Sequence, residues 1–312
     1  MTRRTAPRPV RRPVRRLARR VAQSLLVVLA LVAVPDSAVH PASFSLVAVA
    51  DAKAVDFDDG IVWFLVLGSD AREGEDVMDG RADAIELVGL DFDTGRATAV
   101  AIPRDTWVDI PGHGPDRINA ALHEGGPELV ADLVEELVGI VPDYVFTTGF
   151  DGFVSMVDSI GPVPVVSLFT FQPPDGPVPV SRGLNRMDGE EALAFARARV
   201  ALPRSDFDRI TNQQSLMKGI LRRLRTGEDA EGFIERGSLA ALRGFDTDLS
   251  PVDLYRLAQA VTTFRVSQVT TCAIIGTPAV ENGAQVLHVD PRLARRVGQD
   301  VRNDARLDRG CG

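Results

Sequence analysis

The sequence predicts an α/β fold, a layered α/β/α domain with a central mixed β-sheet flanked by helices. Short apolar runs alternate with amphipathic segments along the 312 residues, which is the pattern of strands packed between helices. Two predicted strands are joined by a short turn at Asp93 to Gly95, and such a hairpin makes the sheet mixed rather than purely parallel. Since 45% of the residues are hydrophobic, the chain can bury a large core.

The first 58 residues are predicted to precede this domain. Residues 1–20 contain nine arginines and no acidic residue, and form a basic N-terminus expected in the cytoplasm. Residues 21–34 are mostly apolar, short for a transmembrane helix of about 20 residues and suited to a signal-peptide core. A single-pass anchor and a cleaved signal both place the rest outside the cytoplasm, and a basic arm on a cytosolic protein is the remaining alternative. Residues 35–58 resemble a linker.

The core, residues 59–227, is predicted to begin with three strands. Ile61 to Leu67 is an unbroken apolar run, too short for a helix and typical of a strand buried on both faces. Residues 73–80 are acidic with two glycines, which indicates a flexible loop. Ala84 to Phe92 and Arg96 to Ile102 are the two strands on either side of the hairpin turn.

Helices and strands alternate in the second half of the core. Pro127 to Leu137 has one apolar side, a proline in its first turn and Gly139 after its end, the signals of an amphipathic helix. The other expected elements are a strand at 144–148, a helix at 153–160, a strand at 163–168, a helix opened by a capping box at 188–191, and a helix at 207–224.

Residues 228–312 are predicted to be a C-terminal extension packed on the core. A second capping box at Ser250 opens a helix through about Val261, and residues 266–275 are rich in β-formers, whereas the tail after Asp290 shows no clear pattern. Cys272 and Cys311 are compatible with one disulfide if the domain is exported, and with two unrelated thiols otherwise.

The charge distribution excludes non-specific nucleic-acid binding. Residues 21–312 carry 26 basic and 43 acidic residues, a formal charge of −17, so an anion site in this part of the chain must be local. No helix-turn-helix pattern is present. Nucleotide-binding glycine motifs, Cys-x-x-Cys, Gly-x-Ser-x-Gly and histidines at metal-ligand spacing are also absent from the sequence.

An acidic residue and an arginine occur together after a predicted strand or in the loop beyond it. The three pairs are Asp70 with Arg72, Arg81 with Asp83, and Arg104 with Asp105. Ligands of open α/β sheets bind outside the carboxyl ends of the strands. Carboxylates there suit Mg²⁺, and arginines suit the phosphate oxygens that Mg²⁺ bridges. A local salt bridge is the alternative explanation for each pair taken alone.

A second polar group lies between Leu193 and Gln214. Arg197 and Arg199 are two residues apart, and a helix from residue 206 would place Asp206, Arg209 and Gln213 on one narrow face. Arginine offers planar, permanently charged, bidentate donors, so this group predicts a phosphate clamp. A solvated charged face is the alternative.

At these residues the sequence resembles the LytR-CpsA-Psr family, from about Phe64 to Leu221. The resemblance is carried by the segments 67–72, 80–83, 102–106, 110–112, 117–121, 149–153, 157–161, 195–199 and 206–209, and by Gln213 and Gln214. It implies a membrane-anchored protein of mainly Gram-positive bacteria. Such proteins transfer a glycopolymer from a polyprenyl-pyrophosphate carrier to peptidoglycan through a phosphodiester, with Mg²⁺.

The resemblance also assigns roles to residues of this chain. It implies that Asp70 and Asp83 bind the metal. The residues that it implies for the pyrophosphate are Arg81, Arg104, Arg117, Arg197, Arg199, Arg209 and Gln213. We count Asp70, Asp83, Arg81, Arg199 and Asp206 as catalytic candidates, with Asp206 as a general base.

Three positions depart from the family pattern. Arg117 replaces a usual lysine, Phe195 a common tyrosine, and Asp208 a common glycine, which adds a negative charge beside Arg209. None of them removes a group expected to touch the pyrophosphate, so the site is expected to be intact.

Phosphoryl transfer requires positioning and charge neutralisation, which arginines and a cation supply. We expect the prenyl chain to lie between the helices at 127–137, 153–160 and 207–224, although an ordinary core explains the same leucines. Two other functions compete with the transferase: a polyprenyl-pyrophosphate phosphatase that uses water as the acceptor, and a non-catalytic membrane-associated regulator of the cell envelope.

Overall fold

The computed structural model describes residues 44–49, 60–72, 74–227, 245–247, 249–250, 257, 261 and 264–311, all in one unit that spans Pro41–Gly312. The predicted basic N-terminus and the apolar segment at 21–34 lie outside the described residues, as does most of the helix expected at 250–261. None of the helices in the described ranges has the length and apolar character needed to cross a bilayer.

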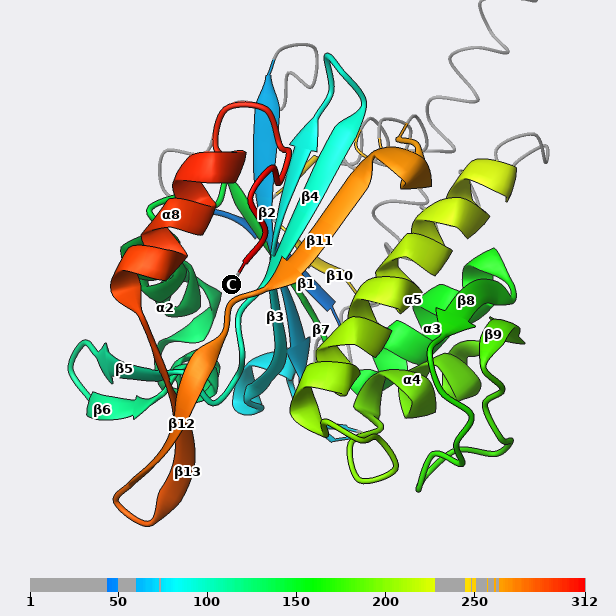
Figure 1. The fold of residues 1–312 in the computed structure, drawn as a ribbon, viewed down its shortest axis with the longest axis horizontal. Helices are drawn as coiled ribbons and strands as arrows, with labels where there is room; N and C mark the ends of the chain where they lie inside the picture. Colours follow the sequence, from blue (N-terminus) through cyan, green and yellow to red (C-terminus); the bar gives the residue numbers. More distant parts are fainter. Residues whose placement is uncertain are drawn as a thin grey trace, which may run out of the picture. The chain divides into compact units, whose positions relative to one another are not determined.

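A seven-stranded mixed sheet forms the centre of the fold (Figure 1). Its strands are, in spatial order, β10 (Phe245–Thr247), β1 (Phe44–Ala48), β7 (Tyr144–Thr148), β2 (Ile61–Ser69), β3 (Ala82–Asp91), β4 (Arg96–Ala101) and β11 (Val269–Ala273). Strand β2 runs parallel to β7 and antiparallel to β3, and β3 and β4 form the predicted hairpin with Gly95 at a φ of +66°. The prediction of a mixed central sheet is therefore confirmed.

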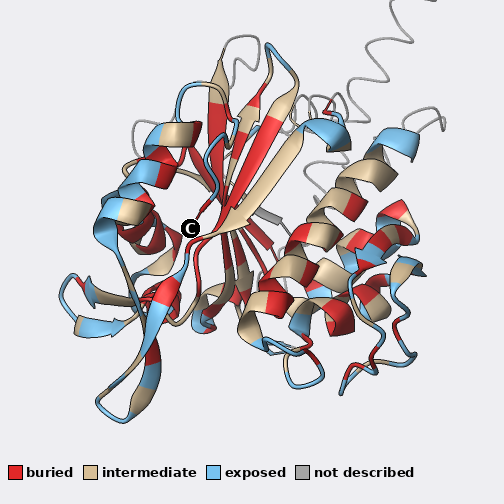
Figure 2. Cartoon of the chain, in the orientation of Figure 1, coloured by how far each residue is buried: buried red, intermediate tan, exposed pale blue. Residues whose placement is uncertain are grey.

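Helices cover both faces of this sheet (Figure 1). On one face lie α2 (Ala121–Val138) and α8 (Pro291–Val301), and on the other lie α3 (Phe150–Ile160), α4 (Gly189–Arg197) and α5 (Asp206–Gly227). Side chains alternate along β2, so Leu65 and Leu67 join the core beneath α2 whereas Val66 faces the opposite layer. Figure 2 shows buried residues concentrated in the strands and on the inward sides of the helices.

Helix ends follow the signals in the sequence. Gly139 terminates α2 in the left-handed conformation with a φ of +75°, which suits glycine because it has no Cβ. The capping box that opens α4 is present, since the Asp188 side chain accepts from the Glu191 backbone N–H and the Glu191 side chain accepts in return. These two signals are local, which explains why the sequence predicts them.

Three two-stranded sheets surround the central one. They are β5 (Trp107–Ile110) with β6 (Gly114–Arg117), β8 (Val163–Ser167) with β9 (Gly183–Met187), and β12 (Gly276–Glu281) with β13 (Ala284–Val289). Short 3-10 helices are η1 (Val77–Asp79), η2 (Ile118–Ala120) and η3 (Val266–Gln268). The predicted strand at 163–168 thus belongs to a peripheral hairpin, whose second strand has a sequence poor in β-formers and was not predicted.

Three expectations about segments need correction. The expected linker at 35–58 contains β1, which pairs with β7 and β10, so the folded part begins earlier than residue 59. The expected acidic loop contains η1, whose Val77 is buried. The expected C-terminal extension contributes β11 to the central sheet and α8 to a helical layer.

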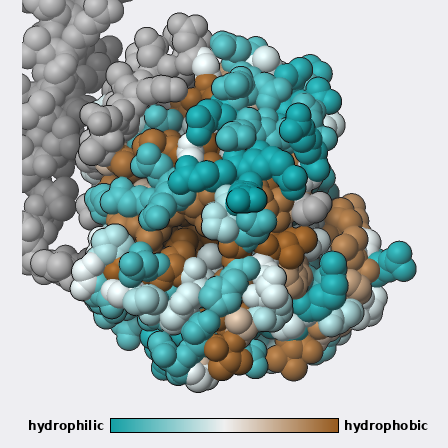
Figure 3. All heavy atoms as spheres, turned by 60° about the vertical axis from the view of Figure 1, so that its left-hand side comes forward, coloured by the Kyte–Doolittle hydropathy of each residue, from teal (hydrophilic) through white to brown (hydrophobic). Residues whose placement is uncertain are grey.

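Hydrophobic and hydrophilic residues are mixed on the face shown in Figure 3. Isolated apolar side chains are normal on the surface of a folded domain, because polar atoms do not suffice to cover it. The pattern of this face therefore does not locate a site, and the interior must be considered.

The tail is tied to the central sheet by a disulfide between Cys272 on β11 and Cys311, whose Cα atoms are 5.7 Å apart. Of the two alternatives for the cysteines, the structure contains the disulfide. The bonded residues are 39 positions apart, so the bond closes a loop that includes β12, β13 and α8.

We predict that reduction of this disulfide, or Cys311→Ser, lowers the free energy of unfolding by about 4 kcal/mol, the chain-entropy value for a loop of this length. Urea unfolding with and without reductant measures the difference. Equal midpoints, or two free thiols in the denatured, unreduced protein, would contradict the prediction.

Candidate active site

A cavity of about 390 Å³ lies between the central sheet and the layer of α3, α4 and α5. Its apolar wall is formed by Val66, Phe146, Phe150, Phe153, Met156, Leu193, Leu216, Met217 and Ile220. Its polar residues include Ser69, Asp83, Arg197, Arg199, Arg209 and Gln213. The cavity therefore combines a long apolar surface with a group of charged side chains.

Helix α2 does not line this cavity, because α2 packs on the opposite face of the sheet. The expectation that residues 127–137 contribute to a prenyl slot is therefore wrong.

Asp83 stands at the centre of the polar group. One of its oxygens accepts a hydrogen bond from Arg104 Nη1 at 2.5 Å, and the other lies 3.9 Å from Arg209 Nη1. Arg104 follows β4, whereas Arg209 lies in the first turns of α5. A single carboxylate thus connects the end of the central hairpin to the helical layer.

The position of Asp83 depends on a β-bulge. The pairing of β2 with β3 passes from Gly68 opposite Ala84 to Ser69 opposite Ala82, which leaves Asp83 as the extra residue. A bulge interrupts the alternation of side chains and can redirect one of them. As a result Asp83 and its neighbour Ala84 both line the cavity. The predicted pair of Arg81 with Asp83 is replaced by a pair of Arg104 with Asp83.

The connector between α4 and α5 supplies further arginines. Arg197 ends α4, with its guanidinium 4.4 Å from the centre of the Phe150 ring and 3.7 Å from Asp175. Arg199 follows in the connector, and its Nε lies 3.1 Å from Asp206 Oδ1. The same oxygen lies 3.0 Å from Arg209 Nη2, so Asp206 holds two guanidinium groups together.

The Nε–H groups of Arg104 and Arg209 are buried and keep unused donor capacity. Among the described residues, Arg104 Nε and Arg209 Nε have no hydrogen-bond partner, and the Arg209 side chain is only 4% exposed. Burial lowers the pKa of Arg209. For Arg104 burial works in the same direction, but the carboxylates of Asp83 and Asp105 outweigh it and its pKa is raised. Buried N–H donors without acceptors are costly, and an anionic ligand would satisfy them.

The remaining predicted residues lie at different distances from this group. Asp70 Oδ1 accepts the backbone N–H of Arg81 at 2.6 Å, while Arg81 itself is exposed and does not line the cavity. Arg117 lies 3.5 Å from Asp105 and also stays outside the cavity wall. Gln213 lines the cavity and donates to Ala196 O at 3.3 Å.

The described residues contain no group of three or more histidine, cysteine or acidic side chains placed to hold a metal. Mg²⁺ needs less than that, because it commonly takes one or two carboxylates and completes its shell with water and substrate phosphate. Asp83 lines the cavity whereas Asp70 does not, and the backbone N–H of Asp70 donates to Arg81 O, two residues before Asp83. Carboxylate oxygens such as theirs are ligands that suit Mg²⁺.

Phe150 and Glu86 are among the cavity residues that the sequence analysis does not predict. Phe150 stacks against Arg197, and Glu86 is a buried acid in the wall formed by β3. The signal for Glu86 is present in the sequence: it is a charged residue between the apolar neighbours Ile85 and Leu87 of a predicted strand. Phe150 belongs to the segment 149–153 that carries the family resemblance, but its contact with Arg197 depends on the packing of α3 against α4 and has no pattern in the sequence.

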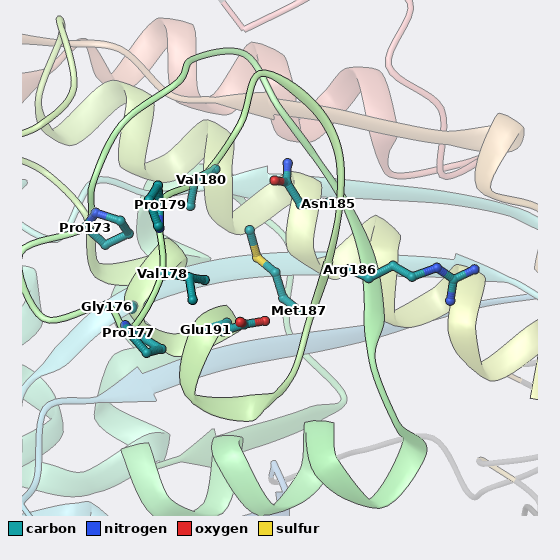
Figure 4. A pocket seen from close by; sticks show the side chains of 11 residues that line it. Pro173, Gly176, Pro177, Val178, Pro179, Val180, Asn185, Arg186, Met187 and Glu191 are labelled. Atoms are coloured by element: carbon teal, nitrogen blue, oxygen red, sulfur yellow. The ribbon is translucent and has the colours of Figure 1, made fainter.

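A smaller cavity of about 150 Å³ lies at the periphery, between the loop at 173–180 and β9. Figure 4 shows its prolines, with the side chain of Arg186 directed away from them. Glu191, the acidic residue among the described residues that line it, is engaged in the capping box of α4. It therefore lacks the grouped charges of the large cavity.

Asp208 does not act on Arg209 as the sequence suggested. Its buried carboxylate accepts the backbone N–H of Arg204 at 2.8 Å and the Nε of the same residue at 2.9 Å. Ser205, the residue after Arg204, adopts a φ of +46°, which is unusual for a residue with a side chain. Asp208 thus closes the connector onto the first turn of α5 and fixes the segment that carries Arg199.

We predict that Asp208→Ala lowers the free energy of unfolding by about 2 kcal/mol, because it removes a buried acceptor at the start of a helix. Asp308→Ala is the matched control, since Asp308 pairs with Arg306 at 2.9 Å on the surface and should cost below about 1 kcal/mol. Urea unfolding compares the two variants. Equal losses would mean that Asp208 does not fix the connector.

A family model described as the LytR_cpsA_psr family matches residues 42–302. The chain is 34% identical over 174 residues to the probable cell wall biosynthesis protein LcpB of Corynebacterium glutamicum, which covers 52% of this chain and 41% of that protein. It is 29% identical over 240 residues to the polyisoprenyl-teichoic acid–peptidoglycan teichoic acid transferase TagU of Enterococcus faecalis. This match covers 77% of this chain and 78% of that protein.

A solved structure of YwtF (TagT), a LytR-CPS2A-psr family protein with bound octaprenyl pyrophosphate lipid, is similar with a TM-score of 0.63 and 25% identity. The similarity covers 83% of this chain and 95% of that one. The chain spans about half the length, or less, of the first curated relatives that it matches.

Proposed function

The chain belongs to the LytR-CpsA-Psr family, and from this we propose that it is a phosphotransferase that moves a glycopolymer from a polyprenyl-pyrophosphate carrier onto peptidoglycan. The observation that carries the proposal is the arginine–carboxylate group of Asp83, Arg104, Asp206 and Arg209 at one part of an otherwise apolar cavity. A lipid-linked pyrophosphate has the same two parts, a long apolar chain and a compact anion.

In the proposed complex the prenyl chain lies along the apolar wall and the pyrophosphate lies against the arginines. The free Nε donors of Arg104 and Arg209 supply hydrogen bonds to phosphate oxygens, and the half-exposed Arg199 adds a third guanidinium. Names of similar proteins support this assignment, because one is a teichoic acid transferase and another has octaprenyl pyrophosphate bound.

The reaction requires a hydroxyl group of the acceptor to attack the phosphorus that bears the glycan. A new P–O bond forms, the bond from that phosphorus to the bridging oxygen breaks, and polyprenyl phosphate leaves with the electron pair. Arginines held in place before the reaction stabilise the charge that develops on the phosphate oxygens. The acceptor hydroxyl supplies the nucleophile, so the protein needs none of its own.

Asp206 is constrained in the role of general base. Its Oδ1 is buried between Arg199 and Arg209, so only Oδ2, which accepts from Arg209 Nη2 at 3.2 Å, could take the proton of the acceptor. We propose that its main contribution is to position the two guanidinium groups, which would otherwise repel each other.

Mg²⁺ is part of the proposal. Asp70 and Asp83 are the residues that would hold it, and the ion would neutralise part of the phosphate charge. Asp83 would then serve both the ion and Arg104, so its loss should weaken both contributions.

The phosphatase that uses water as acceptor fits the same cavity and remains the alternative enzyme. Incubation with a lipid-linked donor and a peptidoglycan fragment separates the candidates by product. A transferase forms a new phosphodiester, a phosphatase releases phosphate without joining glycan to the acceptor, and a non-catalytic regulator does neither.

We predict that Asp83→Asn and Arg199→Ala each lower the rate of transfer at least about a hundredfold, because each removes a charged contact to the developing phosphate charge. Arg199→Lys should recover only part of the loss, since lysine cannot bind in a bidentate manner. A chelator of Mg²⁺ should stop the reaction. The measurement is formation of the phosphodiester product.

Arg306→Ala is the matched control for these variants. Arg306 also pairs with an aspartate, Asp308 at 2.9 Å, but at an exposed position in the C-terminal segment, so activity should persist. Near-normal transfer by both site variants, or transfer that is insensitive to the chelator, would place the active site elsewhere.

We also propose that the folded part is extracytoplasmic and follows a single-pass anchor at residues 21–34, with secretion after signal cleavage as the alternative. External protease should therefore digest the chain beyond residue 51 on intact spheroplasts. N-terminal sequencing of the mature protein decides between anchor and signal. Protection of the whole chain from the protease would refute the export.

A further inference from the structure

Glu86 is a buried acid in the wall of the large cavity. It lies on β3, is 6% exposed, and its Oε1 has no hydrogen-bond partner among the described residues. In the described part of the chain, Asp83 and Glu86 are the acidic residues that line this cavity, and Asp83 belongs to the polar group. The proposed transfer chemistry does not use it.

The carboxyl group lies in the apolar part of the cavity. Glu86 is three residues beyond Asp83, which is about 10 Å further along an extended strand. It pairs across the sheet with Val66 on β2 and Ala101 on β4, and Val66 lines the same cavity. Met217 and Ile220 of α5 belong to this wall as well. A chain that runs from the arginines along the apolar wall would pass this carboxyl group.

Few charged groups face Glu86. On α5, Lys218 and Arg222 lie on this side, and Lys218 Nζ donates to Thr271 Oγ1 of β11 at 3.1 Å. No ion pair joins Glu86 to Lys218 in the part of the chain that the structure describes. Of the two strands that pair with β3, β2 contains no charged residue, and β4 contains only Arg96, which lies at the other end of that strand from Ala101 and pairs with Asp304. The other charged groups of the wall are Asp83, Arg197, Arg199 and Arg209 of the polar group.

We propose that Glu86 is a specificity-determining residue of this cavity, and that an apolar chain fills the cavity only together with a proton on the Glu86 carboxyl group. An ionised carboxylate without partners is strongly disfavoured in an apolar environment, whereas a neutral carboxyl group is tolerated. The proposal rests on the proposed function insofar as the chain is the prenyl part of the lipid carrier.

Burial raises the pKa of Glu86 to about 7, against the opposing effect of Lys218. A chain in the cavity would displace the water that remains near the carboxyl group and raise this pKa further. Binding then takes up a proton, so the affinity is highest below pH 7 and falls as the pH rises through the pKa that Glu86 has in the protein without ligand. This is the expected sign for a group whose pKa is higher in the bound form.

The test compares the full-length protein in detergent with Glu86→Gln, a neutral variant of the same size. Octaprenyl pyrophosphate is the probe, and its dissociation constant is measured from pH 5.5 to 8.5. Titration of the pyrophosphate itself affects both proteins equally, so the ratio of the two constants isolates Glu86. Calorimetry in two buffers of different ionisation enthalpy measures the protons taken up on binding.

We expect equal affinities at pH 5.5 and roughly thirtyfold weaker binding by the unmodified protein than by Glu86→Gln at pH 8.5, the value for one proton and a pKa near 7. At pH 7 the unmodified protein should take up about half a proton more than the variant. Glu86→Met, which makes the wall wholly apolar, should behave as Glu86→Gln does and serves if that variant folds poorly.

The possible failures are distinguishable. Measurable binding with parallel pH curves and equal proton uptake would overturn the role of Glu86 and leave the proposed function intact. Absence of binding by every protein at every pH would overturn both.

Discussion

The site depends on one carboxylate that is shared between two layers of the fold. Asp83 bonds to Arg104 after β4 and faces Arg209 on α5, so the central hairpin and the helical layer meet at a single side chain. The β-bulge that makes this possible leaves Asp83 without a partner opposite it on β2. Asp206 then holds Arg209 and Arg199 together, which brings three guanidinium groups to one place although like charges repel.

The same arrangement explains why the cavity has two parts. Because α5 carries Asp206 and Arg209 in its first turns and Leu216, Met217 and Ile220 further along, one helix lines both the polar and the apolar part. The strands repeat this order, with Asp83 at the start of β3 and Glu86 deeper within it. In both layers the cavity residues therefore change from polar to apolar in the same direction, which suits an amphiphilic lipid.

Local signals made much of this predictable. Three of the signals are local in the sequence: the hairpin turn, the capping box of α4, and the spacing of Asp206, Arg209 and Gln213. The structure confirms the hairpin and the two helices that they indicate. Features that depend on distant pairing were missed. Strand β1 forms because it pairs with β7 and β10, which are distant in the sequence. The direction of the Asp83 side chain depends on a β-bulge that no sequence pattern indicates. Solvent exposure could not be predicted either. The sequence assigns Arg81 and Arg104 to the same pyrophosphate site, but Arg81 is exposed to solvent and Arg104 is largely buried.

A crystal structure of the chain with octaprenyl pyrophosphate would test the central claim most directly. The account predicts phosphate oxygens within hydrogen-bond distance of Arg104, Arg199 and Arg209, and the prenyl chain between β2, β3 and α5 beside Glu86. A pyrophosphate bound away from Asp83, or a chain bound in the peripheral cavity at 173–180, would contradict it.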